Sequence, residues 1–376
     1  MTVWARMCRA TVLLPKYNEG RETMTSTNDT RVASYKPLIA PGDLLAELPL
    51  GEQSTDLVEN ARAEVKRVLD GEDDRLLVVV GPCSVHDTES AMDYARRLSE
   101  LVPSVSADLC VVMRVYFEKP RTTVGWKGLI NDPGLDDTYD VHRGLRTARK
   151  LLLDINALGL PAGTEFLDPI TPQYIADVVS WGAIGARTTE SQVHRQLSSG
   201  LSTPVGFKNG TDGDVQVAVD AVGAAAASHT FFGVDPAGAG SVVETTGNPD
   251  CHVILRGGRS GPNHDPASVG AALNVIGGAG LPRRLMIDAS HANSGKDHVR
   301  QVGVAEEIAE QVAEGEKGII GVMLESFIEE GAQKLGDPAK LTYGQSITDK
   351  CMGWETTEGV LAGLAEAVRR RRKNAA

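Results

Sequence analysis

Short β-branched runs alternate with longer amphipathic stretches from Arg75 onward, and this alternation constrains the fold more than any other feature. It is typical of βαβ units, in which helices bury both faces of a parallel sheet. The expected strands are residues 76–80, 110–115, 160–166, 182–187, 204–208, 252–256, 285–288 and 319–324. Eight such units favour an α/β fold of the closed (β/α)8 type, a TIM barrel. An open doubly wound sheet is the alternative.

Two further segments fall outside this alternation, and the start of one helix can be recognised within it. Strand-like residues 230–234 and 241–245 flank a turn-rich stretch, which predicts an inserted β-hairpin within 228–247, between barrel units 5 and 6. Apolar residues at helical spacing from 41 to 70 predict an N-terminal helical extension. Thr171-Pro172 predicts a helix start with Thr171 as its N-cap.

We therefore divide the chain into an N-terminal extension with helices, 1–72, and a barrel, 73–376, that contains the hairpin. Met24 opens a polar stretch and is a candidate for the true start, which would leave residues 1–23 outside the native protein.

Composition excludes several classes of partner. A net charge of −12 argues against nucleic acid and acidic membranes, because both would repel the surface. Five cysteines without paired spacing indicate a reducing compartment, and we expect a cytoplasmic protein. The sequence has no apolar stretch as long as a membrane span.

Basic side chains recur at the ends of the expected strands, where the chemistry of an α/β barrel lies. They are Arg114, Lys119, Arg187, Lys208 and Arg256. Any one of these basic residues alone is as readily explained by an ion pair with a neighbouring carboxylate as by a ligand. Five converging in an acidic chain imply a phosphate or carboxylate ligand.

A second set of side chains has metal-ligand chemistry: Cys83, His291, Glu325 and Asp349. Thiolate and imidazole favour a borderline transition metal over magnesium. Taken alone, Cys83 reads as a core thiol and His291 as a hydrogen-bonded histidine. The metal hypothesis therefore depends on all four meeting at the mouth of the barrel.

Several long motifs resemble the type I 3-deoxy-D-arabino-heptulosonate-7-phosphate (DAHP) synthases, and the resemblance covers about residues 73–371. The motifs are GPCS at 81–84, MRVYFEKPRTTVGWKG at 113–128, WGAIGARTTESQVHR at 181–195, GFKNGTDG at 206–213, ILRGG at 254–258, SHAN at 290–293 and SITD at 346–349. The resemblance implies condensation of phosphoenolpyruvate with erythrose 4-phosphate, the first step of the shikimate pathway.

The resemblance also implies roles for individual residues. The metal, one divalent Mn²⁺, Fe²⁺, Zn²⁺ or Co²⁺ ion, would be held by Cys83, His291, Glu325 and Asp349. Phosphoenolpyruvate would be held by Arg114, Lys119, Arg187, Lys208 and Arg256, and Asp349 would also face substrate. Arg121 and Thr122 would take the phosphate of erythrose 4-phosphate. The expected catalytic residues are Cys83, His291, Lys119 and Glu165, the last two as alternatives for proton transfer.

In the resembled family the hairpin region forms part of an allosteric pocket for an aromatic amino acid. We expect Ser202, Phe231 and Gly233 to line it, and Gly233 favours tyrosine as the inhibitor because a small residue leaves room for a phenol. A homodimer or homotetramer is also implied. Three alternatives stay open: a 3-deoxy-octulosonate 8-phosphate synthase, a Schiff-base phosphosugar aldolase acting through Lys208, and a non-catalytic binder of phosphorylated ligands.

Overall fold

The computed structural model describes residues 27–123 and 125–375, so the proposed start at Met24 lies outside the described residues. The chain divides into two units, Met1–Leu38 and Ile39–Ala376. In the described part of the first unit, the Tyr35 hydroxyl donates a hydrogen bond to Asp29 Oδ1 at 2.7 Å. The boundary predicted at residue 72 stays a prediction.

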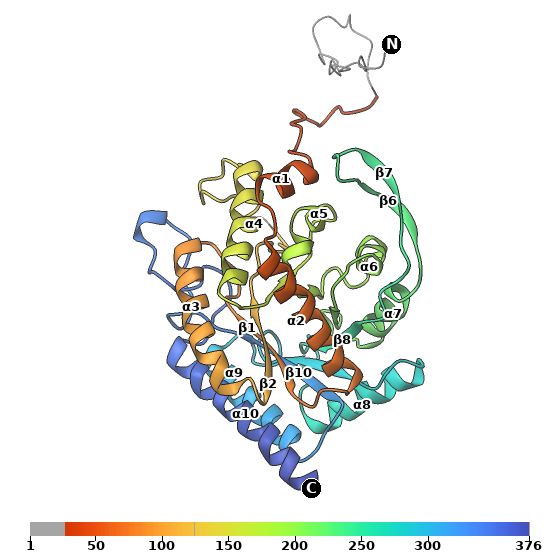
Figure 1. The fold of residues 1–376 in the computed structure, drawn as a ribbon, viewed down its shortest axis with the longest axis vertical. Coiled ribbons are helices and arrows are strands. Elements are labelled where there is room, and N and C mark those ends of the chain that lie inside the picture. The colour runs from red at the N-terminus through yellow and green to blue at the C-terminus, as the bar shows by residue number, and fades with distance from the viewer. Residues whose placement is uncertain (1–26, 124, 376) are drawn as a thin grey trace, which may run out of the picture. The chain divides into compact units, whose positions relative to one another are not determined.

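The second unit contains a closed barrel of parallel strands in the order β1-β10-β9-β8-β5-β4-β3-β2 (Figure 1). All eight expected strands form, which confirms the TIM barrel and rules out the open sheet. The barrel strands are β1 (Leu76–Gly81), β2 (Leu109–Arg114), β3 (Ala162–Glu165), β4 (Trp181–Ile184), β5 (Val205–Lys208), β8 (Cys251–Leu255), β9 (Leu285–Asp288) and β10 (Ile319–Glu325).

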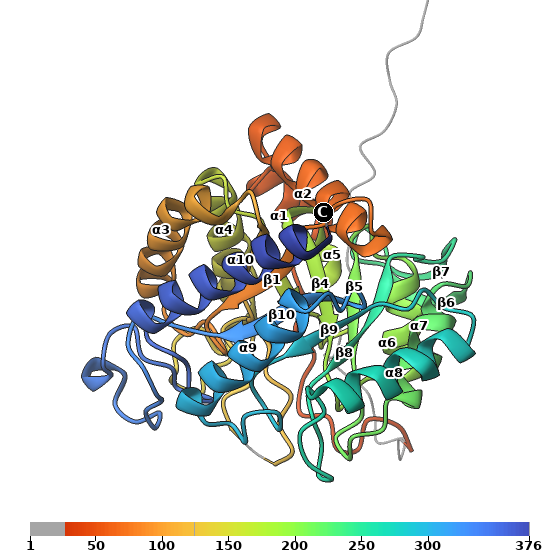
Figure 2. The same ribbon diagram turned by 90° about the horizontal axis from the view of Figure 1, so that it is seen from below.

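Helical segments precede the barrel and follow each of its strands. They are α1 (Pro41–Glu47), α2 (Glu52–Asp70), α3 (Thr88–Val105), α4 (Val141–Ala157), α5 (Pro172–Ile175), η1 (Ala176–Val178), α6 (Gln192–Ser199), α7 (Gln216–Ala225), α8 (Pro266–Gly278), α9 (His298–Ala313), η2 (Pro338–Lys340) and α10 (Trp354–Ala375). The long C-terminal helix α10 packs against α9, as Figure 2 shows from below.

Alternate residues of the strands point into the barrel and out toward the helices, as the pleat requires. Leu77 and Val79 of β1 belong to an inner cluster, whereas their neighbours Leu76 and Val78 belong to the outer core. Three residues of α2 join the inner cluster: Val65, Val68 and Leu69. Because α2 leads directly into β1, this helix closes the amino end of the barrel. The opposite, carboxyl end is the one available for a site.

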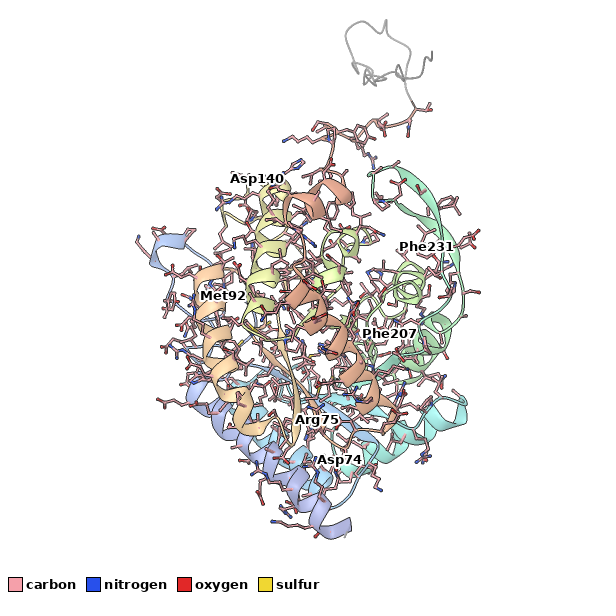
Figure 3. The ribbon with its side chains drawn as sticks, in the orientation of Figure 1. Asp74, Arg75, Met92, Asp140, Phe207 and Phe231 are labelled. Carbon is pink, nitrogen blue, oxygen red and sulfur yellow. The ribbon has the colours of Figure 1, made fainter. Side chains whose placement is uncertain are left out.

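The predicted hairpin forms between α7 and β8, from β6 (Thr230–Val234) and β7 (Gly240–Glu244). It lies outside the barrel, and Figure 3 labels Phe231 on it. Phe231 pairs with Val243, and the next pair joins Phe232 to Val242. One face of the hairpin is exposed, because 94% of Phe232 is accessible to solvent.

Thr171 occupies the N-cap position of α5 and Pro172 begins the helix, as predicted, but the Thr171 side chain makes no capping hydrogen bond. It instead donates a hydrogen bond to Glu118 Oε1 at 3.1 Å. Glu118 is buried and accepts from the backbone N–H groups of Leu167 and Asp168 as well. A buried carboxyl group needs such donors more than a four-residue helix needs a cap.

We expect the buried guanidinium of Arg149 to contribute strongly to the packing of α4 against the helices beside it. It donates to Leu48 O at 2.7 Å, to Tyr174 O at 3.0 Å, and to both oxygens of Asp177 at 2.6 and 2.8 Å. Arg149→Ala should lower the free energy of unfolding by about 3 kcal/mol, because buried acceptors lose their donors. Lys150→Ala, which removes an exposed ion pair with Asp154 on the same helix, should cost under about 0.5 kcal/mol. Denaturant unfolding of both variants checks this expectation, and equal losses would contradict it.

Candidate active site

A cavity of about 210 Å³ opens at the carboxyl ends of the barrel strands. Eight of the predicted site residues line it: Cys83, Arg114, Lys119, Arg121, Glu165, Arg187, His291 and Asp349. Residues separated by hundreds of positions in the chain therefore share one small volume. The parallel strands account for this, since their carboxyl ends meet at one end of the barrel.

The segment after β2 carries Lys119 and Arg121 and is fixed at its base. Glu118 and Gly128 form an antiparallel bridge, and Lys119 N–H donates to Lys127 O at 2.9 Å. Gly128 has a φ of 118° there, and a Cβ at this position would collide with the carbonyl of Phe117, so only glycine allows the close approach. Arg121 Nε donates to Trp126 O at 2.7 Å, which turns this side chain back toward the loop.

Three of the four predicted metal ligands come together. Donor atoms of Cys83, Glu325 and Asp349 all lie within 4.8 Å of one another. His291 is not a member of that group, but its Nε2 lies 3.8 Å from Glu325 Oε1 and its side chain lines the same cavity. Its other ring nitrogen, Nδ1, lies 2.8 Å from Asp288 Oδ2.

Opposite charges surround the carboxylate of Glu325, which has no exposed surface. Arg114 Nη2 donates to Oε1 at 3.0 Å, and Ser290 Oγ donates to Oε2 at 2.7 Å. Burial raises the pKa of Glu325, but the nearby His291 and Arg114 outweigh it, so the pKa lies below that of an ordinary glutamate. Glu325 is thus ionised at neutral pH.

The thiol of Cys83 is buried beside this carboxylate, and Lys119 Nζ lies 3.2 Å from its sulfur. Burial and the Glu325 charge raise the pKa of the Cys83 thiol. A thiolate and two carboxylates this close repel one another, and a divalent cation among them would relieve that repulsion. The donor set therefore fits a borderline transition metal, with sulfur and oxygen ligands and an imidazole alongside.

The five basic residues predicted to hold an anion are arranged in two ways. Arg114, Lys119 and Arg187 line the cavity. Lys208 is buried and its Nζ pairs with Asp288 Oδ2 at 2.8 Å. The half-buried Arg256 is near enough to Arg187 for their charges to interact, and burial lowers the pKa of Arg256. Thr122 is exposed on the loop and is not among the residues that line the cavity.

Sequence reasoning missed three residues at this site, Asp288, Ser290 and Lys296. Asp288 is fully buried between Lys208 and His291. Its position as the last residue of an expected strand was the signal that could have identified it. Ser290, within a quoted motif, donates to Glu325, and Lys296 lines the cavity with its Nζ 3.1 Å from Asp349 Oδ1. Lys296 gave no comparable signal.

A second, larger cavity of about 1050 Å³ lies between the hairpin and the outer helices. The three residues predicted for an effector pocket, Ser202, Phe231 and Gly233, all line it. So do Val58, Glu59 and Arg62 of α2, which sequence analysis did not assign to it.

In the part of the chain that the structure describes, no helix is long and apolar enough to cross a membrane.

Comparison with known proteins agrees with this geometry. Residues 50–362 match the model of the DAHP synthetase I family. The chain is 59% identical over 359 residues to a phospho-2-dehydro-3-deoxyheptonate aldolase of Corynebacterium glutamicum, covering 93% of this chain and 97% of that protein. It is 55% identical over 345 residues to the Phe-sensitive enzyme of Escherichia coli K12, covering 92% and 98% of the two chains.

The tyrosine-inhibited enzyme of Schizosaccharomyces pombe is 50% identical over 351 residues, with 92% of this chain and 94% of that protein covered. A solved structure of phospho-2-dehydro-3-deoxyheptonate aldolase from Francisella tularensis superposes with a TM-score of 0.89 at 50% identity, covering 91% of this chain and 99% of the other. On the extent of these matches, the chain belongs to the DAHP synthetase I family.

Proposed function

We propose that this chain catalyses the condensation of phosphoenolpyruvate with erythrose 4-phosphate and water, which yields DAHP and phosphate. The observation that carries the proposal is one cavity that combines basic side chains with thiol, imidazole and carboxylate donors. The relatives named phospho-2-dehydro-3-deoxyheptonate aldolase support the same reaction. Their names do not support the octulosonate alternative.

Cys83, Glu325, Asp349 and His291 would hold one divalent transition metal at this site. When bound, such an ion supplies Lewis acidity toward the aldehyde oxygen of erythrose 4-phosphate. The identity of the metal among Mn²⁺, Fe²⁺, Zn²⁺ and Co²⁺ stays open, because the donor set suits each of them.

The basic side chains would bind two anionic substrates against their mutual repulsion. Arg114, Lys119, Arg187, Lys208 and Arg256 would hold phosphoenolpyruvate, and Arg121 with Thr122 would hold the phosphate of the aldose. Fixed cations orient the methylene of the enol toward the aldehyde and stabilise the phosphate that leaves.

Glu165 is the better candidate for the proton of the attacking water. It is buried at the cavity wall, and its Oε1 has no hydrogen-bond partner among the described residues. An unpartnered carboxylate oxygen of this kind can accept a proton from water. Lys119 Nζ is already in contact with Cys83 Sγ, so it is better placed to orient the phosphate and the thiolate.

A Schiff-base aldolase is disfavoured by the surroundings of Lys208. Its ammonium is buried against Asp288 in an ion pair, whereas a Schiff-base lysine needs a neutral, free amine.

We also propose that the cavity beside the hairpin binds an aromatic amino acid, with tyrosine favoured. Some relatives are named Phe-sensitive, Trp-sensitive or tyrosine-inhibited, so inhibitors differ among similar chains. A Cβ at Gly233 would lie 2.6 Å from Val243 Cγ2, so a larger residue would narrow this cavity. The cytoplasmic location and the homodimer or homotetramer stay predictions.

Removal of the thiol tests the metal site. Cys83→Ala should lower kcat by roughly 1,000-fold in protein that has been stripped of metal and resupplied, because several kcal/mol of Lewis-acid stabilisation depend on the bound ion. The control Cys110→Ala removes another buried thiol, inside the barrel, and should keep kcat within a few-fold. A coupled assay of phosphoenolpyruvate consumption measures both, and an active Cys83→Ala would refute the ligand role.

Substitution in the hairpin tests the effector site. Gly233→Ser should raise the tyrosine concentration for half-inhibition roughly tenfold, since overpacking costs at least about 1.4 kcal/mol. Gly240→Ser, on the other strand where a Cβ meets open space, should leave inhibition unchanged. Inhibition curves with tyrosine, phenylalanine and tryptophan measure the effect. Equal insensitivity of the unmodified protein to all three would remove the effector proposal.

A further inference from the structure

Every proposed metal ligand has a polar or charged partner outside the ligand set. Cys83 has Lys119, Glu325 has Arg114 and Ser290, and His291 has Asp288. For Asp349 that partner is Lys296, whose Nζ lies 3.1 Å from Oδ1 and 3.3 Å from Oδ2. Partners of this kind fix the orientation of metal ligands and tune their basicity.

Asp349 needs such a partner more than the other ligands do. Glu325 ends a barrel strand and is enclosed, whereas Asp349 lies in the segment between η2 and α10 and its side chain is 34% exposed. A carboxylate on an irregular segment has several rotamers open to it, and only some of them face Cys83 and Glu325. Something outside the ligand set has to select one.

Two ion pairs join the Asp349 segment to the loop that follows β9. In one pair the basic residue lies in the loop, and in the other it lies in the Asp349 segment. Lys296 pairs with Asp349, and the adjacent Asp297 pairs with Lys350 at 3.7 Å. Asp297 is also the N-cap of α9, where it accepts from the N–H groups of Val299 and Arg300. The loop after β9 therefore offers a fixed base for the Asp349 segment.

The backbone of Lys296 is itself held in place next to His291. Its N–H donates to His291 O at 2.6 Å, and both residues have left-handed φ values, 61° and 53°. Non-glycine residues in this region carry strain that tends to persist at functional sites. The turn thus delivers the imidazole and the ammonium to one cavity from a single short loop.

We propose that Lys296 is a positioning residue for the metal site: it holds the Asp349 carboxylate toward Cys83 and Glu325. One carboxylate oxygen would face the ion while the other keeps its contact with the ammonium. This inference rests on the proposed function, because it concerns the ion that the function requires.

Lys296 has two opposing effects on metal binding, and their balance decides whether its removal raises or lowers the Kd for the metal. An ammonium near a divalent cation repels it, so a Lys296 that merely competed for Asp349 would weaken metal binding. The Lys296–Asp349 pair is partly exposed, so its direct attraction contributes little. Loss of an orienting partner typically costs 10- to 100-fold in metal affinity. Orientation is therefore expected to outweigh repulsion.

The experiment measures metal affinity without turnover. Metal-free protein is titrated with Co²⁺, and the thiolate-to-cobalt absorption of Cys83 reports occupancy of the site. Lys296→Met removes the ammonium but keeps the Cβ and the apolar stem, and it should raise the Kd for Co²⁺ by roughly 10- to 100-fold. Lys296→Arg should stay within a few-fold of the unmodified protein. The matched control Lys340→Met breaks a different exposed ion pair, with Asp337, and it should leave the Kd unchanged.

Each outcome decides. Unchanged or tighter binding by Lys296→Met overturns the inference and leaves the proposed reaction intact. Absence of the absorption band in the unmodified protein removes both the metal site and the inference. Equal Tm values of the metal-free variants show that folding is unaffected. If Lys296→Met lowers the Tm, Lys296→Gln replaces it. If Lys296→Gln lowers the Tm by the same amount, Lys296 has a structural role and the proposal is overturned.

Discussion

The ionised carboxylate of Glu325, buried at the end of β10, sets the requirements for the whole mouth of the barrel. A charge without exposed surface is tolerated only where donors and cations compensate it. Arg114 and Ser290 supply them to the side chain, and Gln301 of α9 exchanges hydrogen bonds with the Glu325 backbone at 2.8 and 2.9 Å. The remaining ligands and cations are arranged around this fixed negative centre.

Much of this arrangement could be predicted from the sequence because it depends on strand ends. A buried parallel strand has a recognisable composition, and the residue that closes it must face the carboxyl end of the barrel. Lys208 and Glu325 follow from that rule, and so would Asp288 if the rule had been applied to the last residue of its strand. Lys296 and the Thr171 hydroxyl do not follow from it, because their partners are set by how loops meet in space. Local propensity assigned Thr171 to a helix cap, and the tertiary demand of Glu118 prevailed.

Glu118 contacts two segments, and each of them contributes to one of the two cavities. Burial and the neighbouring Asp168 raise the pKa of this carboxyl to about 8. It precedes Lys119, which lines the barrel-mouth cavity, and accepts hydrogen bonds from the segment that continues into Pro169 and Ile170, which line the hairpin cavity.

Helix α2 contributes residues both to the barrel interior and to the hairpin cavity. Val65, Val68 and Leu69 close the amino end of the barrel, while Arg62, one turn earlier, lines the hairpin cavity and donates to the carbonyls of Ala176 and Val179. Deletion of α2 would therefore open the amino end of the barrel and remove part of the lining of the hairpin cavity at the same time. Single replacements on β6 or β7 would change the lining of that cavity and leave the closure of the barrel intact.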